Sequence, residues 1–199
     1  MSAEPPIPRV KGSALAYWLT WYAQHRDPAE LGAIAARIPP EERGEIDPTS
    51  PTLGVISTAW YPAHAVGRIL DGVTEGMSAK ERAQLIEEST AAGVEQGIRG
   101  IFKLAFELLA TPERYAKHIQ RFWNQLHDTG TRRVEIVGPG EAISIIEDWP
   151  GHHPLLCTVT METMAAVFRR MGLEDVEVMR VECVGAHDPR CKAIVRWRP

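Results

Sequence analysis

Three cysteines carry the clearest chemical signal in the sequence. Cys183 and Cys191 stand on either side of a turn at 184–190 that contains glycine, histidine, aspartate and proline, and Cys157 lies earlier in the chain. Residues that face each other across an antiparallel strand pair have Cβ atoms about 4.5–5.5 Å apart. Two such thiolates could bind one metal ion at about 2.3 Å each. The spacing therefore predicts a shared site if the third thiol reaches the same place.

The strands on both sides of this turn would position two of the thiols. Alternate residues of a strand share a face, so the pattern predicts that Val181 lies opposite Ala193 and that Cys183 lies opposite Cys191. Cys157 falls on the first turn of a helix that must cover this sheet. We therefore expect all three sulfur atoms to meet where the strand pair contacts the helix.

A fourth ligand would complete a tetrahedral site. His187 in the turn is the predicted ligand, and His152 or His153, just before the helix, are the alternatives. Glu182 points to the wrong face of a regular strand. Thiolate-rich sites select zinc, so the predicted cofactor is a structural zinc. Two other interpretations stay open, namely small buried hydrophobic residues and a redox pair with a spare thiol. The predicted metal site is Cys157, Cys183, Cys191 and His187.

Composition limits the classes of function. The chain has 199 residues and a formal charge of −4, which is typical of a single globular domain that does not bind nucleic acid. The longest basic clusters, Arg132–Arg133 and Arg169–Arg170, are interpreted as solvated faces. The sequence shows neither a signal peptide nor an apolar run long enough to span a membrane. We expect a cytoplasmic protein, in which clustered cysteines favour metal binding or catalysis over disulfides.

Periodicity predicts helices first and strands afterwards. Apolar residues at spacings of three and four, together with capping residues, indicate helices over 13–24, 28–37, from 62 onward, 79–110, 112–127 and 154–171. The last of these carries an apolar face formed by Leu156, Val159, Thr160, Thr163, Val167 and Met171. Residues 40–56 are interpreted as a surface loop.

The remaining segments favour two antiparallel strand pairs. One pair flanks Gly138-Pro139-Gly140, and the other is formed by 175–184 and 191–198. The predicted fold class is α+β, with N-terminal helices packed on an antiparallel four-stranded sheet built from a C-terminal β-β-α-β-β unit. As one domain over 1–199, the chain divides into an extended arm (1–10), a mainly helical part (11–130) and the β-β-α-β-β unit (131–199).

Glycines and aromatic residues indicate a binding cavity. Three glycines lie inside the helix predicted for 79–110, and each costs about 1 kcal/mol relative to alanine. They favour either a close helix crossing or the wall of a pocket. The aromatic residues concentrate in the helical half, where they could form a core or line an apolar cavity. The predicted ligand-contacting residues are Trp60, Gly93, Gly97, Ile101 and Phe102.

The spacing Cys-x25-Cys-x7-Cys, formed by Cys157, Cys183 and Cys191, resembles the 4-vinyl reductase-type small-molecule-binding domain. That fold is related to the Bet3-type trafficking subunits and to haem-nitric-oxide-binding domains. The resemblance implies a zinc held by three cysteines and a glutamate, as in phenol-sensing members, although Arg180 stands where that glutamate would fall. The stretches "VKGSAL", "WYP", "DTG" and "GHHPLLC" are also similar to a family of myxobacterial paralogues of about this length.

Sequence motifs for haem and for catalysis are absent. Haem-nitric-oxide-binding domains use a Tyr-x-Ser-x-Arg motif beside a ligating histidine, and the sequence lacks it. His64 and His118 lie on predicted helices beside apolar faces, where a histidine is more often a hydrogen-bonded structural group. The sequence also lacks a serine nucleophile elbow, a Walker loop, a dinucleotide fingerprint and a His-Glu-x-x-His motif.

The hypothesis that combines these observations is a non-enzymatic sensor module for signal transduction. It would bind a small apolar or aromatic molecule between helices and sheet, with a zinc at one end, and it could act as a homodimer. The alternatives are a Bet3-like interaction or scaffold subunit and, with less support, a tetrapyrrole-related reductase or a haem-binding protein.

Overall fold

The computed structural model describes residues 7–99 and 110–199. Its helices are α1 (Gly12–His25), α2 (Pro28–Ala36), α3 (Pro40–Arg43), α4 (Ala63–Val73), α5 (Ala79–Arg99), α7 (Pro112–Leu126) and α8 (Pro154–Arg170), with a short 3-10 turn η1 (Val184–Ala186). Its strands are β1 (Arg9–Lys11), β2 (Trp60–Pro62), β3 (Thr131–Gly138), β4 (Glu141–Glu147), β5 (Glu177–Glu182) and β6 (Cys191–Arg196).

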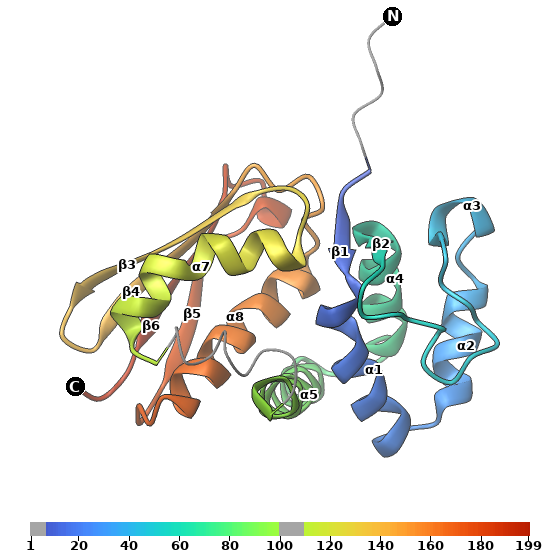
Figure 1. Cartoon of the computed structure of the whole chain (residues 1–199), viewed down its shortest axis with the longest axis horizontal. Coiled ribbons are helices and arrows are strands. Elements are labelled where there is room, and N and C mark those ends of the chain that lie inside the picture. The colour runs from blue at the N-terminus through green and yellow to red at the C-terminus, as the bar shows by residue number, and fades with distance from the viewer. Residues whose placement is uncertain (1–6, 100–109) are drawn as a thin grey trace, which may run out of the picture.

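The predicted α+β fold class is confirmed. Strands β3 to β6 form one antiparallel sheet in the order β3-β4-β6-β5, and α8 connects its two hairpins. Helices α1 to α4 gather at one end of the molecule and the sheet lies at the other, while α5 and α8 run between them (Figure 1).

Helix starts follow the capping residues that the sequence contains. Asp27 Oδ1 accepts a hydrogen bond from Ala29 N at 2.9 Å and opens α2. Ser78 and Glu81 form the predicted capping box at the start of α5, with the Ser78 amide donating to Glu81 at 2.8 Å. Thr111 caps α7 by accepting from the Arg114 amide. These local signals therefore fix three helix boundaries directly.

The hairpin around Gly138-Pro139-Gly140 is also confirmed, since β3 pairs with β4 on both sides of it. The register predicted for the second hairpin holds beside the turn, where Glu182 lies opposite Lys192, and is wrong by one residue further along the strands. In the structure Arg180, not Val181, lies opposite Ala193, and an irregularity follows between Arg180 and Glu182. An extra residue in one strand is a β-bulge, which shifts the alternation. The bulge turns Val181 toward solvent, where it is 42% exposed, and returns Cys183 to the buried side.

Two small elements were not predicted from the sequence. Strands β1 and β2 form a two-stranded antiparallel sheet beside the helices, and α3 falls inside the segment interpreted as a loop. Both strands are three residues long, which is too short for a period of two to be detected. Pairing with a distant partner, rather than local propensity, forms them.

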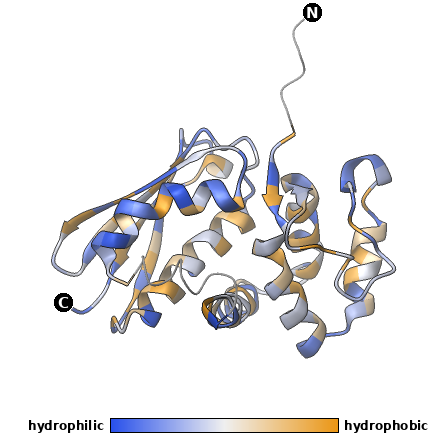
Figure 2. Ribbon diagram, in the orientation of Figure 1, coloured by the Kyte–Doolittle hydropathy of each residue, from blue (hydrophilic) through white to orange (hydrophobic). Residues whose placement is uncertain are grey.

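Helix α7 is amphipathic, and this property fixes its position. Tyr115, Ile119 and Trp123 recur every four residues and are buried, so they form one stripe along the helix. The hydropathy colouring shows hydrophilic and hydrophobic stretches alternating along α7 (Figure 2). The stripe packs toward β3 and α8, and Tyr115 contacts Phe168 edge-on with ring centroids 5.2 Å apart. Helix α7 therefore closes one side of the space between sheet and helices.

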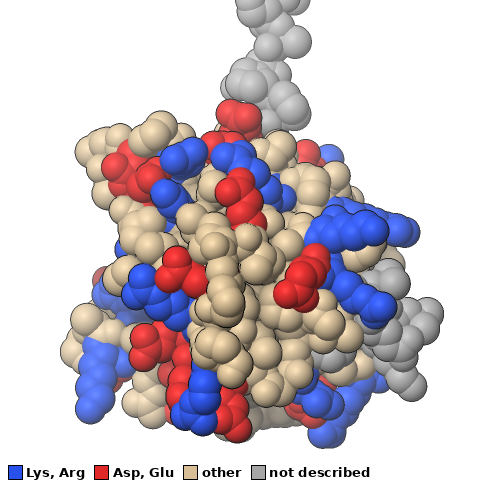
Figure 3. Space-filling model, turned by 90° about the vertical axis from the view of Figure 1, so that its left-hand side faces the viewer, with Lys and Arg blue, Asp and Glu red and all other residues tan. Residues whose placement is uncertain are grey.

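The outer face of the sheet is charged, and its charges are paired. Glu147 contacts both Arg133 and Arg190, and Arg190 also reaches Glu182 at 2.8 Å. The space-filling view of this end shows blue and red atoms side by side, with no large field of one sign (Figure 3). Cross-strand pairs of opposite charge stabilise a solvated sheet face modestly. The outer face also exposes apolar side chains, since Met179 and Val181 of β5 are 51% and 42% exposed, so this face is mixed in character.

None of the helices within 7–99 and 110–199 has both the length and the apolar character that a membrane span needs.

Gly12, the first residue of α1, packs directly against the backbone of Ile56. A substitution there tests the packing of the N-terminal half. A Cβ on Gly12 would overlap the carbonyl oxygen of Ile56, which is a backbone atom and cannot rotate away. We expect Gly12→Ala to lower the free energy of unfolding by about 3 kcal/mol, the upper end of overpacking costs. Gly138→Ala is the control, because a Cβ there meets no atom within 4 Å. Equal stability of the two variants in urea denaturation would contradict the packing described here.

Candidate functional site

An apolar cavity of about 270 Å³ lies between the helical end and the sheet. Its wall is built from α1, α4, α5, α7 and α8, so residues far apart in the sequence meet there. Helix α8 contributes Leu156, Val159, Thr160, Thr163 and Val167. These are five of the six residues predicted from periodicity to form the apolar face of that helix. The sixth, Met171, packs against the core cluster beside the sheet instead.

Helix α8 covers the sheet with a different set of residues. Met164 and Phe168 are fully buried and join one core cluster with Val134 and Val195 of the sheet. The helix is therefore apolar on two sides, one against the sheet and one against the cavity. The prediction of a single apolar face that covers the sheet was incomplete for this reason.

The glycines of α5 form part of the cavity wall. Gly93 and Gly97, two of the predicted ligand-contacting residues, both line the cavity. A Cβ added at Gly93 would meet only the Cβ of Tyr17, at 3.9 Å. No helix crosses close enough at Gly93 to require a glycine there. Between the two explanations given for these glycines, the structure favours the pocket wall at this position.

The predicted ligand-contacting residues also include Trp60, Ile101 and Phe102. Trp60 lies outside the cavity lining, where Lys11 Nζ approaches its ring at 4.6 Å from the centroid. Ile101 and Phe102 lie outside the described residues. Their contacts with a ligand stay a prediction.

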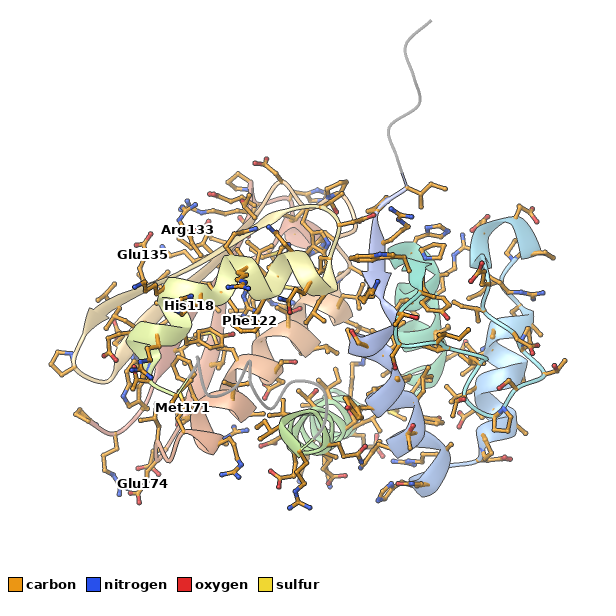
Figure 4. All side chains as sticks on the ribbon, in the orientation of Figure 1. His118, Phe122, Arg133, Glu135, Met171 and Glu174 are labelled. Atoms are coloured by element: carbon orange, nitrogen blue, oxygen red, sulfur yellow. The ribbon has the colours of Figure 1, made fainter. Side chains whose placement is uncertain are left out.

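Two polar residues of the cavity wall were not identified from the sequence, Arg132 and His127. Arg132 was interpreted as a solvated residue, yet it is 6% exposed and lines the cavity. The signal was available, because alternation along β3 puts Arg132 on the same face as buried Val134. Its neighbours Arg133 and Glu135 project away from the helices, whereas Phe122 lies beside the cavity under α7 (Figure 4).

His127 follows the end of α7 and is held by aromatic rings. Its imidazole stacks on Trp123 with centroids 3.8 Å apart and meets Trp149 edge-on at 5.2 Å. Its Nδ1 is buried without a hydrogen-bond partner in the described structure. Burial, with a smaller contribution from the Arg132 charge, lowers the pKa of His127 to about 3. The ring is therefore neutral at physiological pH. His64 and His118 do not line the cavity.

A second hollow, between α2, α4 and the start of α8, has a different character. Its volume is about 590 Å³, and charged side chains line it. They pair among themselves: Arg37 contacts Glu75 at 3.2 Å, and His153 Nε2 lies 3.0 Å from Asp71. This hollow therefore resembles a solvated groove rather than a site for a small apolar ligand.

The three cysteines converge at the N-terminal end of α8, where its first turn meets the sheet. Their sulfur atoms and a ring nitrogen of His152 all lie within 4.8 Å of one another. All three cysteines are buried and none forms a disulfide. His187 is exposed and adopts a left-handed conformation outside this cluster, so His152 takes the position predicted for His187. The four donors are of types that metal ions use, and we refer to them as the thiol cluster.

The acidities of the thiol cluster differ from one cysteine to another. A hydrogen bond from Cys157 lowers the pKa of Cys191, and the backbone amide of Val184 and the nearby His152 lower it further. The same hydrogen bond, together with burial, raises the pKa of Cys157. Cys183 Sγ lies 3.5 Å from His152 Nε2 and 3.8 Å from an Arg180 guanidinium nitrogen. Within the hydrogen-bonded pair, Cys191 therefore ionises more easily than Cys157.

Solved structures share this fold. An H-NOX protein from S. oneidensis in the Fe(II)NO ligation state aligns with a TM-score of 0.67 and 10% identity, over 95% of this chain and 99% of that one. The Fe(II) unliganded H-NOX protein from K. algicida gives 0.62 and 13%, over 95% and 97%. An oxygen-binding H-NOX domain related to soluble guanylate cyclases gives 0.63 and 12%, over 95% of each chain. No protein-family model and no curated protein matches the sequence.

These comparisons correct the family resemblance. The structures that share the fold are H-NOX domains, not 4-vinyl reductase-type or Bet3-type domains. The recognition based on the cysteine spacing and the short motifs was therefore wrong. Three cysteines at two intervals specify few residues of the chain, whereas the shared fold extends over nearly all of it.

The predicted structural zinc is corrected as well. One of the H-NOX structures was determined to probe the function of heme distortion, so the cofactor associated with this fold in the solved structures is a haem. The grouping of the three sulfur atoms and His152 is a geometric fact, but the comparisons do not support a zinc there. Buried small residues and a redox pair are the interpretations left for the thiol cluster.

The depressed pKa of His127 makes stability depend on pH. Its pKa is about 3 in the folded chain and about 6.5 in an unfolded one. As the pH falls below 6.5, the unfolded state binds a proton that the folded state refuses, so stability decreases by up to about 1.4 kcal/mol per pH unit. Between pH 7 and pH 5 we expect the free energy of unfolding to fall by about 1–2 kcal/mol more in the wild type than in His127→Gln. Urea denaturation at both pH values measures this, and parallel losses would show that His127 is protonated in the folded chain.

Proposed function

We propose that this chain is a non-enzymatic ligand-binding module, of the kind that sensors use, and that it holds a small apolar or aromatic molecule in the cavity between the helices and the sheet. The observation that carries the proposal is the composition of the wall. Within the described residues it is formed mainly by aliphatic, aromatic and glycine residues. Its polar groups are a few hydroxyls, the Gln125 amide, the neutral His127 and Arg132, which is its one formal charge. Apolar walls with few polar groups are typical of small-molecule sites.

The arrangement of α8 explains how occupancy could be transmitted. This helix contacts the cavity with one side and the sheet with the other, so a ligand that changes the packing of Thr160 or Thr163 also acts on the contact of Phe168 with the sheet. Packed interfaces of this kind respond by small shifts of whole elements. The signal of binding would therefore be a movement of α8 relative to the sheet.

Haem is the ligand that the structural neighbours point to, so we tested whether the residues present here fit one. The cavity volume of about 270 Å³ lies at the lower end of the range for small-molecule sites, and a porphyrin is a large ligand by that measure. A haem also carries a pair of propionate groups, whereas the described wall offers one cation, Arg132.

An axial ligand is the second requirement of a haem. His127 is the histidine of the described cavity wall, but stacking against Trp123 and the edge contact with Trp149 hold its ring as part of that wall. The Tyr-x-Ser-x-Arg motif of haem-nitric-oxide-binding domains is absent from the sequence. The residues described here do not fit a haem, and the proposal uses the fold of H-NOX domains without their cofactor.

Ligand binding can be tested with a neutral fluorescent probe, N-phenyl-1-naphthylamine, whose emission rises in apolar surroundings. We expect the wild type to bind it and Gly93→Phe to bind it at least about tenfold more weakly, because the new ring would occupy the cavity beside Tyr17. Ala91→Phe is the matched control, since Ala91 lies on the exposed side of the same helix. Unchanged binding by Gly93→Phe, or no binding by the wild type, would contradict the proposal.

A haem titration tests whether the chain binds haem. When haemin is added to the purified chain, we expect no one-to-one complex with a sharp Soret band, because the cavity is small for a porphyrin and the described wall offers one cation for two propionates. Free haemin and a haem protein of known stoichiometry serve as references. A stoichiometric complex whose ferrous form shifts its spectrum on adding nitric oxide would restore the haem-based function instead.

A further inference from the structure

The cavity wall contains a buried positive charge. Arg132 stands near the start of β3, with 6% of its surface exposed, and its side chain extends inward between α7 and α8. The adjacent Arg133 lies on the opposite face of the strand and pairs with Glu135 and Glu147. Two neighbouring arginines therefore have opposite environments, one solvated and paired, the other buried in an apolar wall.

The contacts of Arg132 within the described residues do not neutralise the charge of its guanidinium. The centre of its guanidinium lies 5.9 Å from the ring centroids of both Tyr115 and Trp123. One terminal nitrogen lies 3.6 Å from the sulfur of Met164. Its Nε is buried and has no hydrogen-bond partner among residues 7–99 and 110–199. Aromatic faces and a thioether stabilise a cation weakly compared with a carboxylate.

Nearby ionisable groups do not supply the missing charge. Burial raises the pKa of Tyr115, so its phenol stays neutral at physiological pH. Glu135, three positions further along the chain, pairs with Arg133. Asp128, four positions before Arg132, accepts hydrogen bonds from Arg9 Nε at 2.7 Å and from the Arg9 backbone amide at 2.6 Å. Within residues 7–99 and 110–199, no carboxylate forms an ion pair with Arg132. An unpaired buried charge is costly, so an anion in the cavity is the partner that the site lacks.

We propose that the ligand of this cavity is an apolar carboxylic acid, whose carboxylate pairs with the Arg132 guanidinium and whose apolar body lies along α5 and α8. Guanidinium groups bind carboxylates through two parallel hydrogen bonds, and the unpartnered Nε is one of the donors such a pair would use. A single cation in the wall matches a single anionic group. This inference rests on the proposed function and adds the chemical class of the ligand.

Decanoic acid and decan-1-ol are matched probes for this inference, because they share their apolar chain and differ in charge. Each is titrated against the wild-type chain loaded with N-phenyl-1-naphthylamine, and displacement of the dye is measured. We expect the acid to bind about 10- to 100-fold more tightly than the alcohol, as hydrogen bonds to a charged group would give. Equal affinities of acid and alcohol would overturn the inference and leave apolar binding intact. Failure of the dye and both probes to bind would overturn the proposed function itself.

Variants of Arg132 and Arg133 test which of the two arginines supplies the charge that pairs with the carboxylate. Arg132→Met removes the cation and keeps an apolar side chain, and we expect it to bind acid and alcohol equally while the alcohol affinity stays within about threefold of the wild type. Arg133→Met, on the solvated face, should keep the preference for the acid. An acid preference that survives in Arg132→Met would overturn the assignment.

Thermal stability separates a ligand anchor from a structural arginine. Without ligand, Arg132→Met should melt at a higher temperature than the wild type, because it replaces an unpaired buried charge with an apolar group. A large loss of stability would show that Arg132 holds the fold together, and would overturn its assignment as an anchor. Should that variant fail to fold, the comparison of acid with alcohol on the wild type still decides the chemical class.

Discussion

The structure depends on one constraint, the burial of α8 on two sides. One side packs on the inner face of the sheet through Met164 and Phe168. The other faces the cavity through residues such as Val159 and Thr163. A helix packed on both sides cannot move without changing both contacts. Its first turn also places Cys157 against the sheet. Cavity, sheet and thiol cluster are therefore mechanically connected through a single element.

Helix types and their order could be predicted because short-range signals encode them. Capping residues such as Ser78 and Thr111 act on amides three positions away, so their effect is visible in sequence alone. The meeting of Cys157, Cys183 and Cys191 was also predicted, and the register used to derive it holds beside the turn, where Glu182 lies opposite Lys192. Further along the strands, the bulge after Arg180 shifts the pairing by one residue. Bulges depend on cross-strand pairing, which no local pattern reveals.

The parts that could not be predicted all depend on contacts between distant segments. Strands β1 and β2 exist because they pair with each other. The position of His152 within the thiol cluster, where His187 was expected, follows from how the loop before α8 folds onto the turn before β6. Arg132 is a different case, because alternation along β3 did indicate its buried side. A general expectation that charged residues are solvated outweighed the pattern, although a functional site is where that expectation fails.

Within the described residues the Arg132 guanidinium has no anionic partner, and such a group in an apolar wall lowers stability but can raise ligand selectivity. An apolar pocket alone distinguishes ligands weakly, because one methylene changes affinity by about 1–3 kcal/mol. A buried group that must be paired rejects any ligand that leaves it unsatisfied, and this discrimination is far larger. Arg132 stands near the start of β3 and rests against Met164 of α8. A ligand that pairs with Arg132 would therefore act on the strand and on the helix that covers it. The same charge that selects the ligand would then couple its presence to the contact between α8 and the sheet.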